Sequence, residues 1–109
     1  MAAINFEQVF EKLKAEAKNL AISAVKDYKN EASADALQVI QSMKENLKTW
    51  TMELAEGKIS KTDFQYLVLG QNELTQMSVL KQAGLSLVKT DEFKNSLLNL
   101  VVNTVIGIL

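Results

Sequence analysis

The spacing of apolar residues is the feature that most constrains the fold of this chain. From Phe6 to Tyr28 apolar side chains recur at steps of three and four residues, and from Ala36 to Leu54 they alternate between four and three. An α-helix places such residues on one stripe, whereas a half-buried strand needs alternation at every second residue. No segment of the sequence sustains a two-residue alternation of β-branched side chains. The chain is therefore predicted to be all-α.

Capping residues divide this pattern into four predicted helices, over about residues 5–30, 34–56, 61–89 and 91–108. An N-cap side chain accepts a hydrogen bond from a free backbone N–H in the first helical turn. Residues suited to this role begin all four segments: Asn5, Ser33, Ser60 and Thr90. Gly57 follows the second segment, where a left-handed residue commonly ends a helix.

The connections between these helices are short. Short connections favour neighbours that run in opposite directions, so the sequence predicts a four-helix bundle, antiparallel and up-down. The chain has 109 residues, which is the length of one domain with its own core. Residues 1–109 are therefore expected to form a single helical domain.

Charge is distributed unevenly between the two halves of the chain. The formal net charge is -1, but residues 1–56 hold seven Lys and nine acidic residues, while residues 57–109 hold five Lys and four. From Asn95 to Leu109 there is no charged residue. A helix on the surface of a bundle normally carries charge on its solvent-facing side. The last two predicted helices therefore have too little charge for ordinary surface helices.

The helix over residues 91–108 is the extreme case. Apolar residues cover most of its circumference, and Asn95, Ser96, Asn99 and Asn103 leave only a narrow polar strip. Two explanations are open. Either this unusually apolar helix is the central element of the bundle, or one of its faces is reserved for a partner.

A partner would bind the apolar face of this helix together with small residues of the preceding one. Gly70, Met77 and Gly84 recur at seven-residue steps. Glycine inside a helix costs about 0.5–1 kcal/mol relative to alanine, and close approach of another helix is one reason to retain it. The candidate interface residues are Leu97, Leu98, Val101, Val102, Val105, Ile106, Leu109, Gly70, Met77 and Gly84.

The composition excludes much catalytic and metal-binding chemistry. The chain has no Cys and no His, so it lacks thiolates, imidazole bases and the usual ligands of zinc and haem. The segment from Glu56 to Phe64 resembles the second half of an EF-hand loop. The first half fails, because Met52 and Leu54 would stand where calcium requires oxygen ligands. No catalytic, cofactor-binding or metal-binding residue is assigned, and the chain is not predicted to be an enzyme.

Charge and length also bear on nucleic acids and membranes. All twelve basic residues are Lys, whereas base readout relies on Arg and phosphate binding on a net basic surface. Nucleic-acid binding is therefore not expected. No stretch reaches the ~20 apolar residues of a membrane-spanning helix, and the first residues lack the pattern of a signal peptide. The chain is expected to be cytoplasmic.

The leading hypothesis is a small non-enzymatic module that associates with itself or with another protein through residues 61–89 and 91–108. Two alternatives belong to other classes. One is a membrane-active protein that releases an apolar hairpin. The other is a carrier whose apolar ligand contacts Met43, Met52, Met77 and the four Phe residues. No cofactor is expected in any of the three.

Overall fold

The computed structural model describes residues 5–73 and 76–109, and every regular element within them is a helix. The all-α prediction is confirmed for these residues. In chain order the elements are α1 (Phe6–Ala24), the 3-10 helix η1 (Lys26–Tyr28), α2 (Lys29–Ser42), α3 (Lys44–Ala55), α4 (Lys61–Leu69), the 3-10 helix η2 (Gly70–Glu73), α5 (Ser78–Ala83) and α6 (Leu87–Ile108).

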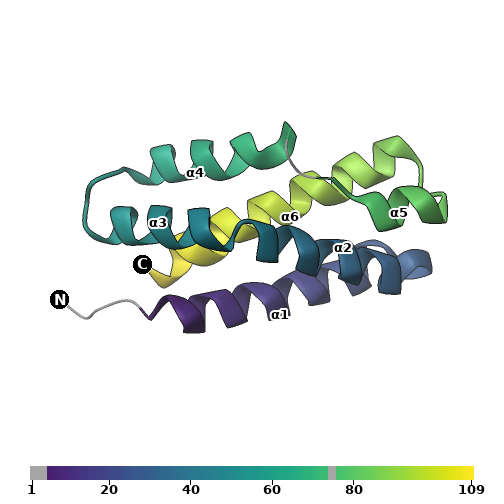
Figure 1. The fold of residues 1–109 in the computed structure, drawn as a ribbon, viewed down its shortest axis with the longest axis horizontal. Coiled ribbons are helices and arrows are strands. Elements are labelled where there is room, and N and C mark those ends of the chain that lie inside the picture. The colour runs from purple at the N-terminus through teal and green to yellow at the C-terminus, as the bar shows by residue number, and fades with distance from the viewer. Residues whose placement is uncertain (1–4, 74–75) are drawn as a thin grey trace.

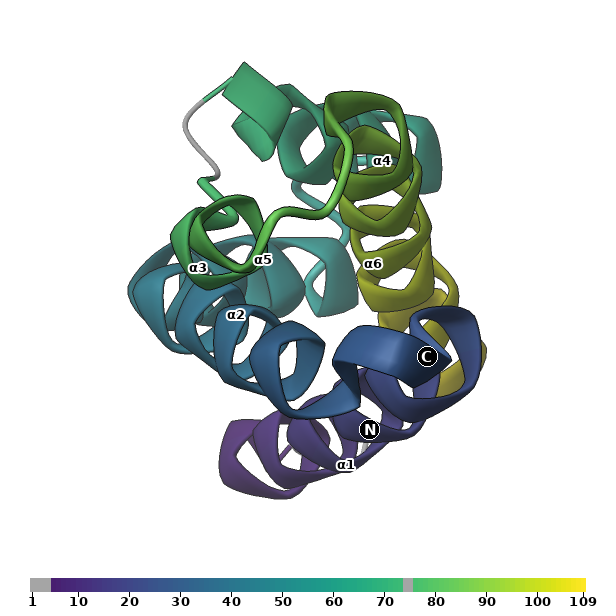
Figure 2. The same cartoon turned by 90° about the vertical axis from the view of Figure 1, so that its right-hand side faces the viewer.

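The helices follow the long axis of an elongated molecule of 46 × 23 × 19 Å. α1 runs in one direction, α2 and α3 return beside it, α4 runs back along α3, and α6 returns to the end where α1 began (Figure 1). Viewed from the end, α1, α2, α4 and α6 surround a common interior (Figure 2). α5 packs mainly on α2 and also contacts α6.

One cluster of buried apolar side chains fills this interior and receives residues from all six α-helices. In α1 and α2 the buried positions change in size along the hairpin. Ala17, Ala21, Ala32 and Ala36 are fully buried near the turn, and their small side chains permit close approach of the two helices. Larger buried residues such as Phe10 lie toward the other end.

The first predicted helix, over residues 5–30, is interrupted. α1 ends at Ala24, because Val25 leaves the helical conformation (φ -131°, ψ 68°), and η1 then leads directly into α2. Ser33 therefore lies inside α2 and is not an N-cap. Val25 and Tyr28 pack against the core from this turn. Their packing stabilises the interruption between α1 and α2, although the sequence has no glycine or proline at this point.

The second predicted helix, over residues 34–56, is divided at Met43. The backbone of Met43 has φ -91° and ψ -2°, and its side chain is buried. The hydroxyl of Ser42 donates to the carbonyl oxygen of Val39 at 2.8 Å. A hydroxyl bonded back to the preceding turn often bends a helix, and here it coincides with the junction of α2 and α3.

The prediction of one helix over residues 61–89 is wrong. α4 ends at Leu69, and Gly70 begins η2. Gly84 ends α5 in the left-handed conformation, with φ +97°, which glycine adopts without the steric cost of a side chain. Both glycines therefore lie at helix ends rather than within a helix. Residues 74 and 75 lie outside the described residues.

The last helix begins four residues earlier than predicted. Ser86, not Thr90, is the N-cap of α6, and its Oγ accepts from the backbone N–H of Lys89 at 3.2 Å. Thr90 is buried in the first turn, where its hydroxyl donates to the carbonyl of Ser86 at 2.8 Å. With these changes the described residues form six α-helices, and a four-helix bundle is not confirmed.

Other predicted helix ends are confirmed. The Asn5 side chain accepts hydrogen bonds from the N–H groups of Glu7 and Gln8. Gly57 adopts φ +76° after α3, and Ser60 caps α4. The residues of each of these caps are close together in the sequence, so the cap can form without contacts from another helix.

Candidate interaction surface

α6 carries most of the predicted interface residues, and the structure places them in the core. Five are at most 3% exposed: Leu97, Leu98, Val101, Val102 and Val105. They are covered because α1 and α4 pack along α6 and α5 also contacts it. This placement supports the explanation in which the last helix is a central element.

The remaining predicted interface residues do not gather at one place. Met77 is buried, Ile106 is half-buried, and Leu109, Gly70 and Gly84 are exposed. A Cβ added to Gly70 or Gly84 would meet no described atom within 4 Å. Among the described residues, no helix packs closely against either glycine. Gly70 and Gly84 instead lie at the ends of α4 and α5.

Large apolar side chains on the surface are concentrated in the second half of the chain. Among the described residues, those beyond position 57 are Tyr66, Leu87, Val88, Ile108 and Leu109, whereas the first half contributes Ile22. Tyr66 is 80% exposed on the outer side of α4, beside a surface hollow that Gln65 and Leu69 also line. The candidate interface predicted from the sequence did not include Tyr66, Leu87 or Val88, because it was drawn from the helix over residues 91–108 and from the seven-residue spacing of Gly70, Met77 and Gly84.

Two of these exposed apolar residues, Val88 and Ile108, lie near the two ends of α6. The solvent-facing side of the helix runs between them. We call the residues that recur along it at steps of four and three the outer stripe of α6: Val88, Glu92, Asn95, Asn99, Asn103 and Ile106. All are exposed except Ile106, which is half-buried. The stripe carries no charge from Asn95 onward. A side-chain hydrogen bond along it joins Asn99 Nδ2 to the carbonyl oxygen of Asn95 at 2.9 Å.

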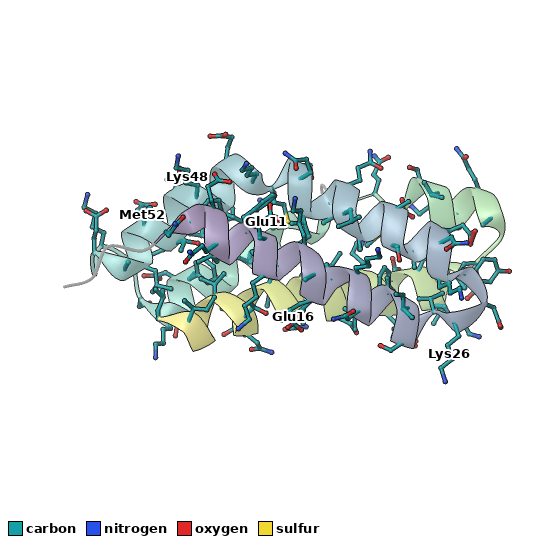
Figure 3. The ribbon with its side chains drawn as sticks, turned by 90° about the horizontal axis from the view of Figure 1, so that it is seen from below. Glu11, Glu16, Lys26, Lys48 and Met52 are labelled. Carbon is teal, nitrogen blue, oxygen red and sulfur yellow. The ribbon has the colours of Figure 1, made fainter. Side chains whose placement is uncertain are left out.

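The surface of the first half is charged in the usual way. Figure 3 looks onto α1 and shows Glu11 and Glu16 on that helix, with Lys48 nearby on α3. The Nζ of Lys44, at the start of α3, lies 3.5 Å from a carboxylate oxygen of Glu7 on α1. Exposed ion pairs of this kind contribute at most about 1 kcal/mol. From Asn95 onward the outer stripe carries no charged side chain, which distinguishes it from the exposed surface of α1.

The residues predicted to line a ligand pocket lie mainly in the core. Met43, Met77 and the four Phe residues belong to the buried apolar cluster, whereas Met52 is half-buried on α3. Packing against other core side chains accounts for the buried six without a ligand.

Asp35 is a buried polar residue that sequence reasoning missed. It lies on α2 with 0% exposure, and its two carboxylate oxygens accept from the backbone N–H groups of Val79 (3.1 Å) and Leu80 (2.7 Å). Asp35 thereby caps α5 from a position more than forty residues earlier in the chain. A signal was present, because Asp35 stands within the apolar spacing of Ala32, Ala36 and Val39.

Thr51 is buried without a hydrogen-bond partner for its hydroxyl, a situation found at no other described side chain. An unsatisfied buried polar group costs about 1–3 kcal/mol. Thr51→Val keeps the shape of the side chain and removes this group, so we expect it to raise the free energy of unfolding by about 1 kcal/mol. Urea denaturation followed by circular dichroism measures the change.

Thr90→Val is the matched control for Thr51→Val. Thr90 is equally buried, but its hydroxyl is bonded to Ser86 at 2.8 Å, so its loss should destabilise the chain by about 1 kcal/mol. Equal effects of the two substitutions would show that hydrogen bonding of the hydroxyl does not determine the result.

Asp63 and Ser60 form a reciprocal capping box at the start of α4. The carboxylate of Asp63 accepts from the Ser60 N–H, and the Ser60 hydroxyl accepts from the Asp63 N–H, both at 3.0 Å. The backbone N–H of Ser60, and then its hydroxyl, hold the pKa of Asp63 below its usual value of 3.8. Since folding favours the charged carboxylate, this stabilisation is present above pH 3.8 and is lost as the pH falls through the lower, folded-state pKa.

Ser60→Ala is expected to raise the pKa of Asp63 toward 3.8, because the hydroxyl is removed and the backbone N–H remains. An NMR titration of the Asp63 carboxyl carbon measures this shift. Ser86→Ala, which removes the cap of α6 instead, should leave the pKa of Asp63 unchanged. An unchanged pKa in Ser60→Ala would contradict the role of the hydroxyl.

The described part of the chain holds neither a cluster of metal-ligating side chains nor a helix that could span a membrane. Within residues 5–73 and 76–109 no group of three or more acidic residues lies together in a way that would hold a metal ion. None of the helices described there has both the length and the apolar character required to cross a bilayer.

Comparison with known proteins adds no relative. No protein-family model, curated protein or solved structure matches the chain.

Proposed function

We propose that this chain is a small non-enzymatic helical module that self-associates through the outer stripe of α6. The observation that carries the proposal is an exposed helix face that is free of charge from Asn95 to Leu109. The central parts of protein interfaces are depleted in charged residues. Removing amide groups from water costs less than removing charges, provided that the amides regain hydrogen bonds.

A second copy of the same chain is the partner that fits this face best. In a two-fold dimer both copies contribute the same surface to the interface, so that surface must be complementary to itself. The asparagine amide meets this condition, because it both donates and accepts hydrogen bonds. An antiparallel pairing centred on Asn99 places Asn95 opposite Asn103 of the other copy. It also sets Glu92 opposite Ile106, so that the two Glu92 side chains do not face each other.

The proposal keeps two further expectations from the sequence. One is that the helices act as an antiparallel, up-down unit, which is in line with the directions of α1, α2, α4 and α6 (Figure 1). The other is a cytoplasmic location, which is in line with the lack of Cys, since proteins of reducing compartments do not depend on disulfides.

Sedimentation equilibrium from micromolar to millimolar protein tests self-association directly. We expect a concentration-dependent rise from the monomer mass of 12.1 kDa to twice that mass. Asn99→Asp places two negative charges together at the centre of the pairing and is expected to abolish the rise. The helix signal in circular dichroism should be retained, because Asn99 is exposed.

Asn19→Asp is the matched control, since Asn19 is an exposed asparagine on α1. This substitution should leave the association constant unchanged. A strictly monomeric wild-type chain over the whole concentration range overturns the proposal. So does equal loss of association in Asn99→Asp and Asn19→Asp, because the dimer would then not depend on the outer stripe.

A further inference from the structure

α5 has little of its own to keep it folded. It is six residues long, from Ser78 to Ala83, and isolated helices shorter than about 12–15 residues are marginal in water. Met77 and Leu80 are its buried anchors, whereas Lys81, Gln82 and Ala83 are exposed. Its position must therefore be maintained by contacts with the rest of the molecule.

The contact with α2 includes a buried charge. Asp35 is the buried charged side chain among residues 5–71 and 76–109, whose side chains the structure describes. Its carboxylate accepts from the N–H groups of Val79 and Leu80, which are the second and third residues of α5. Each hydrogen bond to a charged group is stronger than a neutral one, but the buried carboxylate has also lost its hydration.

Opening of α5 would reverse both effects together. The carboxylate of Asp35 would regain water as its two hydrogen bonds are lost, so hydration offsets part of their free energy. The backbone on either side of α5 departs from helix, at Met77 (φ -106°, ψ 62°) and at the left-handed Gly84. α5 is thus separated from both neighbouring helices, and its movement need not unwind α6.

We infer that residues 77–85 form a strap, latched by Asp35, that opens as a unit while α1, α2, α4 and α6 remain folded. Opening uncovers the apolar surface under Met77 and Leu80, which the closed strap keeps from water. The strap is a conformational device within the chain, and it does not depend on self-association through the outer stripe of α6.

Native-state hydrogen exchange by NMR tests this inference on the full chain, at a concentration where it is monomeric. The amides of Val79 and Leu80 should exchange at least about tenfold faster than those of Leu97 and Val101 in α6, because local opening costs less than global unfolding. Their exchange should also depend less on denaturant, because opening the strap exposes less surface than unfolding the chain.

A substitution far from the strap separates local opening from global unfolding. Phe6 is the first residue of α1, which begins at the end of the molecule opposite α5 (Figure 1). Phe6→Leu destabilises the closed and the open states alike relative to the unfolded chain. It should therefore speed exchange at Leu97 and Val101 about fivefold or more and leave exchange at Val79 and Leu80 unchanged.

Asp35→Ala is expected to act on both sets of amides, because it destabilises the closed state relative to the open and the unfolded states. If Phe6→Leu speeds exchange at Val79 and Leu80 by the same factor as in α6, α5 opens only when the whole chain unfolds, and the inference is overturned. If Asp35→Ala leaves exchange at Val79 and Leu80 unchanged, Asp35 is not the latch. Neither result bears on the outer stripe of α6.

Discussion

Replacing Val101 with Asp is expected to unfold the chain. Val101 has 0% exposure on α6, the helix that contacts α1 and α4. An unpaired carboxylate buried at this position costs several kcal/mol, and the packing of the valine is lost as well. Domains of this size are stable by about 5–15 kcal/mol, so the cost removes most of the stability. Far-ultraviolet circular dichroism should show loss of helix.

Asn103→Asp is the control for Val101→Asp. It introduces the same carboxylate two residues further along α6, on the exposed side. At concentrations where the chain is monomeric, the free energy of unfolding should change by no more than about 0.5 kcal/mol. A Val101→Asp chain that keeps its helix signal and unfolds cooperatively would show that this face of α6 is not core in solution. The partner-face explanation would then regain its support.

The periodic pattern predicted the buried face of the first half well. Phe6, Val9, Phe10, Leu13 and Ala17 all lie on the predicted stripe of α1, and all are buried. This success has a simple physical basis, because a 3.6-residue repeat directly reports the face that an amphipathic helix turns to the core. The pattern did not show the two interruptions in this half, at Val25 after α1 and at Met43 between α2 and α3.

The same pattern failed over residues 61–89 because the stabilising partner lies elsewhere in the chain. α5 begins at Ser78, where Asp35 of α2 supplies the acceptors for its first N–H groups. A local capping signal was therefore absent. At the start of α6, Thr90 was predicted as the N-cap, but Ser86 caps the helix and Thr90 is buried against the core. Burial is a tertiary effect that local capping signals do not report.

The candidate interface shows why charge depletion alone is ambiguous. A helix without charge is expected both at the centre of a fold and at a surface that binds a partner. α6 has a buried side and an exposed side. Leu97 and Val101 face the core, whereas Asn99 and Asn103 face water. Helical spacing distinguishes these sides, but the sequence does not tell which of them another helix covers.

Replacing Phe64 with Ala is expected to destabilise the chain by about 3–5 kcal/mol. Phe64 has 0% exposure on α4, a nine-residue helix whose other buried residue is Val68. Such a short helix depends on its tertiary contacts. Urea denaturation followed by circular dichroism measures the change in the free energy of unfolding.

Tyr66→Ala is the matched control for Phe64→Ala, because it truncates an aromatic side chain on the same helix that is 80% exposed. Its effect on the free energy of unfolding should stay within about 0.5 kcal/mol. Equal effects at the two positions would contradict the orientation of α4.

The consequence of Phe64→Ala extends beyond α4, because α4 packs along α6. When the packing of α4 on α6 is weakened, apolar residues of α6 such as Val101 become accessible to solvent. We therefore expect Phe64→Ala to increase the binding of a hydrophobic dye under conditions in which Tyr66→Ala does not. Dye binding by Tyr66→Ala alone would mean that Tyr66, rather than Phe64, covers the core. In the structure α1 and α4 together cover the core side of α6, whereas Asn95, Asn99 and Asn103 on its other side are exposed.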